Sequence, residues 1–137
     1  MKILIILLSL SLVHFSANTM EVDYTLEFGV VLHDEYGAPV GFKETTYVPI
    51  NTSGKNSLYG LIISKDSQES FTLGSVHILP DNPSNTQKIM GKTMVINGKG
   101  AVFMKTQKDD TPGDYAMELY INGVLYKTIE YQLLTKI

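Results

Sequence analysis

Residues 111–134, TPGDYAMELYINGVLYKTIEYQLL, carry the strongest structural signal in this chain of 137 residues. Apolar and polar residues alternate on both sides of Asn122-Gly123, which is the period of a β-strand with one buried face. The Asn-Gly dipeptide readily takes the two left-handed conformations of a tight two-residue turn. The pattern therefore predicts a β-hairpin, whose first strand begins near Tyr115 and whose second strand spans residues 124–134.

The entry to this hairpin, Pro112-Gly113-Asp114-Tyr115, indicates the class of fold. It resembles the start of the penultimate strand in immunoglobulin-like domains, where the polar tip of an aromatic residue bonds back to the preceding corner. The rest of the hairpin resembles the closing strand pair of such sandwiches. The fold-defining residues are Pro112, Gly113, Asp114, Tyr115, Asn122 and Gly123. We predict an all-β chain that forms an immunoglobulin-like antiparallel β-sandwich of about 7–8 strands.

A second alternating stretch ends near residue 32. Its apolar side consists of Val22, Tyr24, Leu26, Phe28, Val30 and Leu32. We expect this face to pack against an apolar face of the hairpin that consists of Tyr115, Met117, Leu119 and Ile121. Gly29, inside the stretch, predicts a bulge or a close approach of another backbone segment.

Turn residues divide the rest of the chain into further short strands. Residues 42–48 predict a strand that Pro49 ends, and residues 58–64 and 71–79 predict two more. Residues 81–91 predict the longest loop. Residues 93–96 and 101–106 flank Asn97-Gly98-Lys99-Gly100, which predicts a second tight hairpin. No helical period persists after the first 20 or so residues.

Residues 1–17 predict a secretion signal. Met1-Lys2 gives a positive start, and residues 3–13 are almost wholly apolar but shorter than the roughly 20 residues of a membrane-spanning helix. Cleavage after Ala17 leaves one β-sandwich domain over residues 18–137, with no membrane span. The chain has no cysteine, so we expect a disulfide-free bacterial protein that is periplasmic or secreted.

The charge balance excludes one class of partner. The net charge is −3 and the chain contains no arginine, whereas nucleic-acid binding needs clustered arginine and lysine. We therefore predict no nucleic-acid partner.

Short pieces along most of the mature chain are similar to a bacterial exported family described only as a domain of unknown function. They are Glu27-Phe28-Gly29, Thr46-Tyr47-Val48-Pro49, Tyr59-Gly60, His77-Ile78-Leu79-Pro80, Pro112-Gly113-Asp114-Tyr115 and Ile129-Glu130-Tyr131. The family usually has tryptophan after its Pro-Gly-acid turn, where this chain has Tyr115. The resemblance implies a sandwich fold and export, and it implies no catalytic residue.

Ser75 and His77 lie two residues apart on a predicted strand and therefore point to the same face. Serine and histidine form catalytic pairs in hydrolases, but residues 73–77 lack the second glycine of a nucleophile elbow. Side chains at this spacing are also about 7 Å apart, too far for direct proton transfer. We therefore predict no catalytic residue, and a hydrogen-bonding role for His77 in anchoring the loop that begins at Pro80.

Two groups of residues have the side chains that bind divalent ions, although neither has a recognised ligand spacing. The candidate ligands are His33, Asp34 and His77 for one site, and Asp109, Asp110 and Asp114 for the other. The alternative for both groups is a solvated or turn-capping role. We predict no cofactor.

These observations leave three classes of function. The leading prediction is a non-enzymatic module that binds a protein, peptide or glycan through a sheet face, an edge strand or the loops at one end. The alternative is a structural subunit that assembles through edge strands. A small hydrolase or metal-dependent enzyme is the third class, and the missing motifs disfavour it.

Overall fold

A computed structural model describes residues 24–51, 57–80 and 87–135, in which the chain forms ten β-strands and no helix. The strands are β1 (Tyr24–His33), β2 (Pro39–Glu44), β3 (Tyr47–Ile50), β4 (Leu58–Lys65), β5 (Ser70–Ile78), β6 (Lys88–Met90), β7 (Met94–Asn97), β8 (Lys99–Lys105), β9 (Gly113–Ile121) and β10 (Val124–Thr135). Accordingly, no helix that could cross a membrane occurs in these ranges. The predicted cleavage site at Ala17 and the predicted core residue Val22 lie outside the described residues.

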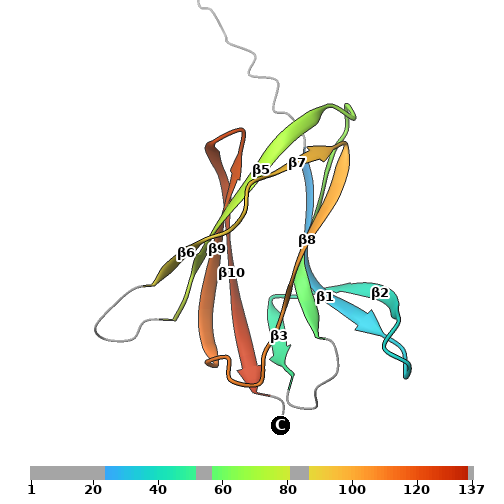
Figure 1. Ribbon diagram of the computed structural model, residues 1–137, viewed down its shortest axis with the longest axis vertical. Helices are drawn as coiled ribbons and strands as arrows, with labels where there is room; N and C mark the ends of the chain where they lie inside the picture. The colour runs from blue at the N-terminus through green and yellow to red at the C-terminus, as the bar shows by residue number, and fades with distance from the viewer. Residues whose placement is uncertain (1–23, 52–56, 81–86, 136–137) are drawn as a thin grey trace, which may run out of the picture.

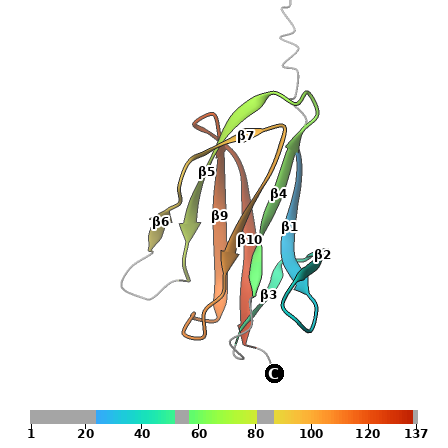
Figure 2. The ribbon, with the colours of Figure 1, turned by 45° about the vertical axis from the view of Figure 1, so that its right-hand side comes forward.

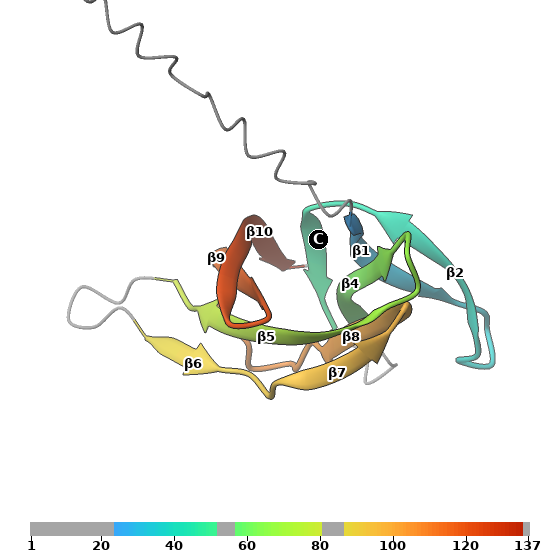
Figure 3. The same cartoon turned by 90° about the horizontal axis from the view of Figure 1, so that it is seen from above.

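The strands form two facing sheets (Figures 1 and 2). Sheet A has the order β2-β1-β4-β8, and sheet B has the order β3-β10-β9-β5-β6, with β7 also paired to β5. Neighbouring strands run antiparallel, except that β3 runs parallel to β10. Seen from above, β6 and β7 lie along one margin of the molecule (Figure 3). The predicted all-β sandwich is confirmed, with more strands than expected.

The core lies between the sheets and is apolar. Its buried side chains include Leu61 and Ile63 from sheet A and Met117, Leu119 and Ile121 from sheet B. Phe28 of β1 is only 7% exposed, and its ring lies 5.0 Å from that of Tyr131 in β10. The two faces that were predicted to pack on each other therefore share one apolar core, although the ring contact of Phe28 is with β10, and Leu32 lies outside the core and is exposed.

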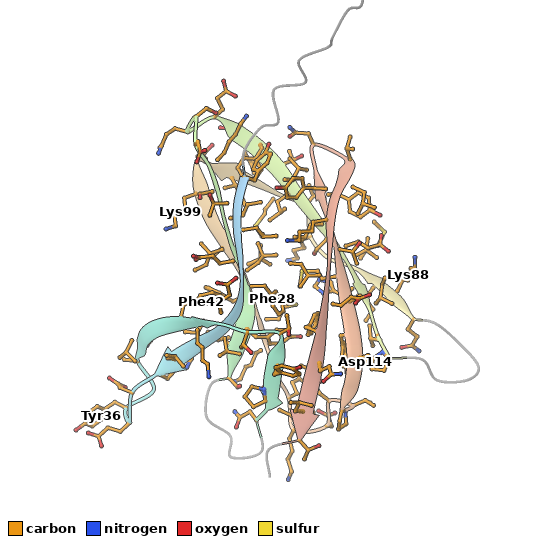
Figure 4. The ribbon with its side chains drawn as sticks, turned by 180° about the vertical axis from the view of Figure 1, so that it is seen from behind. Phe28, Tyr36, Phe42, Lys88, Lys99 and Asp114 are labelled. Atoms are coloured by element: carbon orange, nitrogen blue, oxygen red, sulfur yellow. The ribbon has the colours of Figure 1, made fainter. Side chains whose placement is uncertain are left out.

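β1 meets the backbone of another strand at Gly29. A Cβ atom on Gly29 would lie 2.0 Å from the carbonyl oxygen of Lys43 in β2, and one on Gly60 would lie 1.9 Å from that of Val102 in β8. The close approach predicted at Gly29 is confirmed. Beyond Gly29, the end of β1 and all of β2 project from the sandwich as a hairpin arm, with Tyr36 at its tip (Figures 1 and 4).

The closing hairpin forms as predicted. Asn122 and Gly123 both have positive φ angles, 49° and 80°, which the primed two-residue turn requires. At the entry to β9, the hydroxyl of Tyr115 donates a hydrogen bond of 2.7 Å to the carbonyl oxygen of Thr111. This is the tie to the preceding corner that the resemblance to immunoglobulin-like domains implied.

The second predicted hairpin, at Asn97-Gly98, is wrong. β7 pairs with β5 in sheet B and β8 pairs with β4 in sheet A, so the chain crosses between the sheets at Gly98. Gly98 has a φ of 73°, but Asn97 lacks the positive φ that a primed turn also needs at its first position. The N–H of Lys65 donates to the Gly98 carbonyl at 2.7 Å and holds the crossing in place.

The single strand predicted over residues 42–48 is also wrong. The chain leaves sheet A after Glu44 and enters sheet B as β3 at Tyr47. Pro49 lies inside β3 rather than ending it, because an edge strand tolerates a proline whose nitrogen points away from its neighbour. The N–H of Gln132 donates to the Thr46 carbonyl at 2.9 Å, so alternation turns the nitrogen of Pro49 to the open side.

The loop predicted over residues 81–91 is shorter than expected. Residues 88–90 form β6, which pairs with the end of β5, and residues 81–86 lie outside the described part of the chain. Three residues are too few to show an alternating period, so sequence patterning does not detect such a strand.

Candidate functional site

An open groove of about 850 Å³ crosses the outer face of sheet B, where β5, β9, β10 and β3 lie side by side. Ala116 of β9 lies at its floor, with Ile78 of β5 opposite on one side and Glu130 of β10 opposite on the other. The methyl group of Ala116 is much smaller than its neighbours in this row. Ala116 therefore leaves space between the side chains of Ile78 and Glu130 in the middle of this sheet face.

A second row of side chains forms one end of the groove. Gln132 of β10 lies opposite Asp114 of β9 on one side and Tyr47 of β3 on the other. The Gln132 Nε2 donates a hydrogen bond of 2.7 Å to Asp114 Oδ1, which holds both side chains across the strands. Tyr47 is 60% exposed and offers its ring to a bound molecule.

The groove is acidic. Within the described ranges neither Asp114 nor Glu130 forms an ion pair. A third carboxylate, Glu118, lies further along β9 and accepts hydrogen bonds from Tyr120 Oη at 2.6 Å and Lys88 Nζ at 3.4 Å. Those partners lower the pKa of Glu118, with the Tyr120 hydroxyl the larger cause. Lys88 and Asp114 both lie on sheet B, far from Tyr36 on the arm (Figure 4).

Two buried tyrosines, Tyr59 and Tyr131, and the partly buried Tyr115 support the groove from behind. The rings of Tyr115 and Tyr131 stack with their centroids 5.6 Å apart, and Tyr59 of sheet A packs 5.6 Å from Tyr131. Burial raises the pKa of Tyr131 far above its usual range, so this hydroxyl stays neutral. Tyr115 and Tyr131 alternate along β9 and β10 with Asp114, Ala116 and Glu130, which point to the opposite face. The packing of the tyrosine rings therefore holds in place the two strands that carry the groove.

Ser75 and His77 are closer than predicted. Ser75 Oγ lies 3.1 Å from His77 Nε2, so the two side chains share a hydrogen bond and the distance argument against their contact is wrong. Side-chain rotation at neighbouring positions of one face closes the gap that straight strand geometry leaves. The chain after β6 covers the pair, since the Gly91 N–H donates to the Ser75 carbonyl at 2.8 Å and a Cβ on Gly91 would lie 2.2 Å from Ser75 Oγ.

The candidate ligands His33, Asp34 and His77 lie on separate parts of the fold. His33 and Asp34 are on the arm of sheet A, whereas His77 is on β5 in sheet B. Asp34 Oδ1 accepts hydrogen bonds of 2.9 Å from the backbone N–H groups of Tyr36 and Ala38, so this carboxylate caps the turn at the tip of the arm.

The three acidic residues between β8 and β9 also have separate surroundings. Asp110 Oδ2 accepts a bond of 2.7 Å from the N–H of Gln107 and caps a turn, Asp114 is in the groove, and Asp109 is exposed. Across residues 24–51, 57–80 and 87–135, no group of three or more His, Cys, Asp or Glu side chains is placed to hold a metal ion.

Sequence reasoning singled out Asp114 but not the residues that complete the groove. Glu130 and Gln132 alternate with buried Ile129 and Tyr131, so their outward direction was available from the pattern. Strand order was not available, and it is strand order that brings Tyr47 and Ile78 to the two sides of the same surface.

Taken together, the two facing sheets, the closing β9–β10 hairpin and the Tyr115 corner define an immunoglobulin-like β-sandwich. The predicted fold class is confirmed.

Solved structures support this class. An immunoglobulin-like protein from Pseudomonas aeruginosa superposes with a TM-score of 0.52 and 14% sequence identity, over 82% of this chain and 94% of that one. An alkylpurine DNA glycosylase from Pseudomonas fluorescens, bound to DNA with an abasic-site analogue, has a TM-score of 0.46 and 9% identity, over 83% of this chain and 31% of that one. The first likeness shows the fold alone, and the second carries no argument.

Comparison by sequence gives no relative. No family model matches the chain, and no curated protein matches it. Its place in the exported family of unknown function therefore stays a prediction.

Proposed function

We propose that the protein is a non-enzymatic binding module that holds a basic, extended segment of a protein partner in the groove over Ala116. The observation that carries this proposal is a groove with two carboxylates, Asp114 and Glu130, that have no ion pair in the described chain. Complementary charge steers association and selects the partner. Lysine or arginine side chains of the partner would supply the missing countercharge.

The shape of the groove favours an extended segment. It crosses four strands, with Tyr47 of β3 at one side, Ile78 of β5 at the other, and the carboxylates of Glu130 and Asp114 on the two strands between them. An extended peptide laid across the strands can contact Tyr47 and Ile78 with apolar residues and reach the two carboxylates with basic residues between them. Aromatic residues such as tyrosine are also enriched where proteins recognise one another.

The surroundings of Ser75 and His77 support a function without catalysis. The Gly91 backbone lies against Ser75 Oγ and leaves little room for a substrate at that atom. Burial lowers the pKa of His77, but no carboxylate in the described chain hydrogen-bonds to its ring to orient it. A catalytic serine and histidine need both access and such an orienting group.

Export belongs to the same proposal. It is supported by the apolar segment at residues 3–13 after Met1-Lys2, by the absence of cysteine and by the resemblance to a bacterial exported family. On this proposal the module works in the periplasm or outside the cell, where its partner is a surface or secreted protein with an accessible basic segment.

Two capped peptides test the proposal, one of alternating lysine and alanine and one of alternating glutamate and alanine. We expect the lysine peptide to bind, to shift the amide resonances of Ala116 and Glu130, and to bind more weakly at high salt. Glu130→Gln should weaken binding about two- to fivefold, the value of one exposed charge pair. Ala116→Leu should abolish binding by filling the groove.

Glu27→Gln is the matched control, because Glu27 is an exposed carboxylate on β1 of the other sheet. This variant should bind the lysine peptide as the wild type does. Equal binding of both peptides, or an equal effect of Glu27→Gln and Glu130→Gln, would show that the groove does not select basic segments.

A further inference from the structure

The edge strands of the two sheets differ in how they are protected from pairing with another chain. Proteins protect such edges with lysine, other charges or proline. In sheet A, β2 contains Pro39, Lys43 and Glu44, and β8 begins and ends with lysine. In sheet B, β3 contains Pro49. Three of the edges therefore carry a protecting residue.

The remaining edge, beside β5, consists of β6, which begins with Lys88, and β7, which is not protected in this way. Residues 93–97, which include β7, contain neither charge nor proline. Val95 in the middle of β7 is 67% exposed, and Met90, Ile89 and Met94 add further exposed apolar surface along the same margin (Figure 3). Exposed apolar surface on an open strand edge is typical of a site where another strand adds.

The backbone of Val95 is directed outward from this edge. Val95 lies opposite Thr72 of β5. The N–H of Thr72 donates to Asn122 Oδ1 and its carbonyl accepts from the N–H of Asn122, both at 3.0 Å, so both backbone groups of Thr72 point away from β7. Directly opposite residues of an antiparallel pair either both point these groups toward each other or both point them away from each other. The N–H and C=O of Val95 therefore face the open side.

We propose that two copies of this chain pair through β7, antiparallel, about a two-fold axis at Val95. The stretch Thr93-Met94-Val95-Ile96-Asn97 is self-complementary in this register. Val95 lies opposite its own copy and exchanges both backbone hydrogen bonds with it, as in the hydrogen-bonded pairs of an antiparallel ladder. A two-fold contact uses the same patch on both copies, so one unprotected strand is sufficient.

Charge also favours a second copy in this register. Lys92 lies opposite Gly98 of the other copy, so no lysine directly faces a lysine. Thr93 lies opposite Asn97, which pairs neutral polar residues at both ends of the contact. Cross-strand neighbours of this kind stabilise a ladder, whereas like charges directly opposite destabilise it.

The pairing has a consequence for the groove. A two-fold axis perpendicular to the ladder joins the two B sheets into one and leaves both outer faces on the same side. If the groove binds basic segments, as proposed above, the dimer presents two such grooves to one partner and gains affinity through bivalency.

Sedimentation equilibrium of the purified protein at micromolar to millimolar concentrations tests the pairing. We expect a reversible monomer–dimer equilibrium in the wild type. Val95→Lys should weaken dimerisation at least about tenfold, because it places two ammonium groups directly opposite each other. Val40→Lys is the matched control, since Val40 is 64% exposed on β2, an edge strand of the other sheet, and it should dimerise as the wild type does.

A crosslink tests the register in a chain that has no natural cysteine. Val95→Cys should form a disulfide-linked dimer under mild oxidation, since Cα atoms of a hydrogen-bonded antiparallel pair lie about 5.5 Å apart, within disulfide range. Val40→Cys at the same concentration should crosslink at least tenfold more slowly. A wild type that stays monomeric throughout, or a Val95→Lys variant that is folded by circular dichroism and still dimerises, would overturn the proposal.

Discussion

Tyr115 has two roles at the start of β9. Its ring stacks on Tyr131 behind the groove, and its hydroxyl donates to the Thr111 carbonyl at 2.7 Å. The hydrogen bond therefore ties the loop between β8 and β9 to the strand that carries Asp114 and Ala116. A residue chosen from sequence for the fold is thus also part of the support of the candidate site.

Tyr115→Phe removes this hydrogen bond and keeps the ring. We expect the free energy of unfolding to fall by about 1 kcal/mol, the usual net contribution of one such bond, measured by urea denaturation. Tyr126→Phe is the control, because Tyr126 is exposed and its hydroxyl has no hydrogen-bond partner among the described residues. Equal losses in the two variants would contradict a specific role for the Tyr115 hydroxyl.

His77 makes the stability depend on pH. Burial lowers its pKa below the ordinary value of 6.5, so the unfolded chain binds a proton more readily than the folded chain. The free energy of unfolding should therefore decrease as the pH falls below about 6.5, by less than about 1.4 kcal/mol per pH unit because one proton is involved and the ring is only partly buried.

Denaturation curves between pH 7.5 and 5 would measure this dependence. His77→Gln should remove it in that range, because the carboxylates with shifted pKa values, Glu69 and Glu118, are both lowered from 4.5 and titrate at more acidic pH. A wild type and a His77→Gln variant with parallel pH profiles would exclude His77 as the cause.

At the scale of elements, the two Asn-Gly dipeptides show what local sequence can and cannot predict. The dipeptide at Asn122 turns a hairpin, and the one at Asn97 lies where the chain crosses between sheets. Local preference for a left-handed backbone is the same in both. Only at Asn122 do the flanking strands pair with each other. At Asn97, β8 pairs instead with β4, which has eight residues, whereas β7 has four.

The approach of β2 to β1 should tolerate no side chain at Gly29. We expect Gly29→Ala to lower the free energy of unfolding by at least about 2 kcal/mol, because its Cβ meets a backbone oxygen rather than a flexible side chain. Thermal or urea unfolding would measure the loss.

Gly41→Ala is the control on the partner strand. The nearest atom to a Cβ on Gly41 is Leu32 Cδ1 at 3.7 Å, an ordinary contact. This change should cost little, or stabilise slightly by restricting the unfolded chain. If Gly29→Ala were as well tolerated as Gly41→Ala, the close approach would not limit the arm.

At the scale of the whole molecule, the sandwich separates the two proposed surfaces. The groove lies on the outer face of sheet B, and the unprotected strand β7 lies along the margin that β6 and β7 form (Figure 3). β5 contributes to both, since Ile78 borders the groove and Thr72 pairs with Val95. A substitution in the groove should therefore leave β7 unchanged, and the reverse, so that the two proposals can be tested separately.

The alternation of apolar residues along β1 and β9 and the closing turn followed from local sequence, because each depends on preferences over a few residues that act in any context. The Tyr115 corner was implied by the resemblance to immunoglobulin-like domains. Sheet assignment depended on long-range pairing. It decided that residues 42–48 divide between two sheets and that Asn97-Gly98 is a crossing.

The two candidate surfaces also depend on long-range strand pairing. Val95 is an ordinary residue in the sequence, and Asp114 was predicted there as a turn residue or metal ligand and not as part of a groove. Asp114 lines a groove because β3, β10, β9 and β5 lie in that order around Ala116, and Val95 faces outward because Asn122 binds both backbone groups of Thr72. These contacts join different strands, such as Thr72 with Asn122, 50 positions further along the chain, so only the tertiary structure decides them.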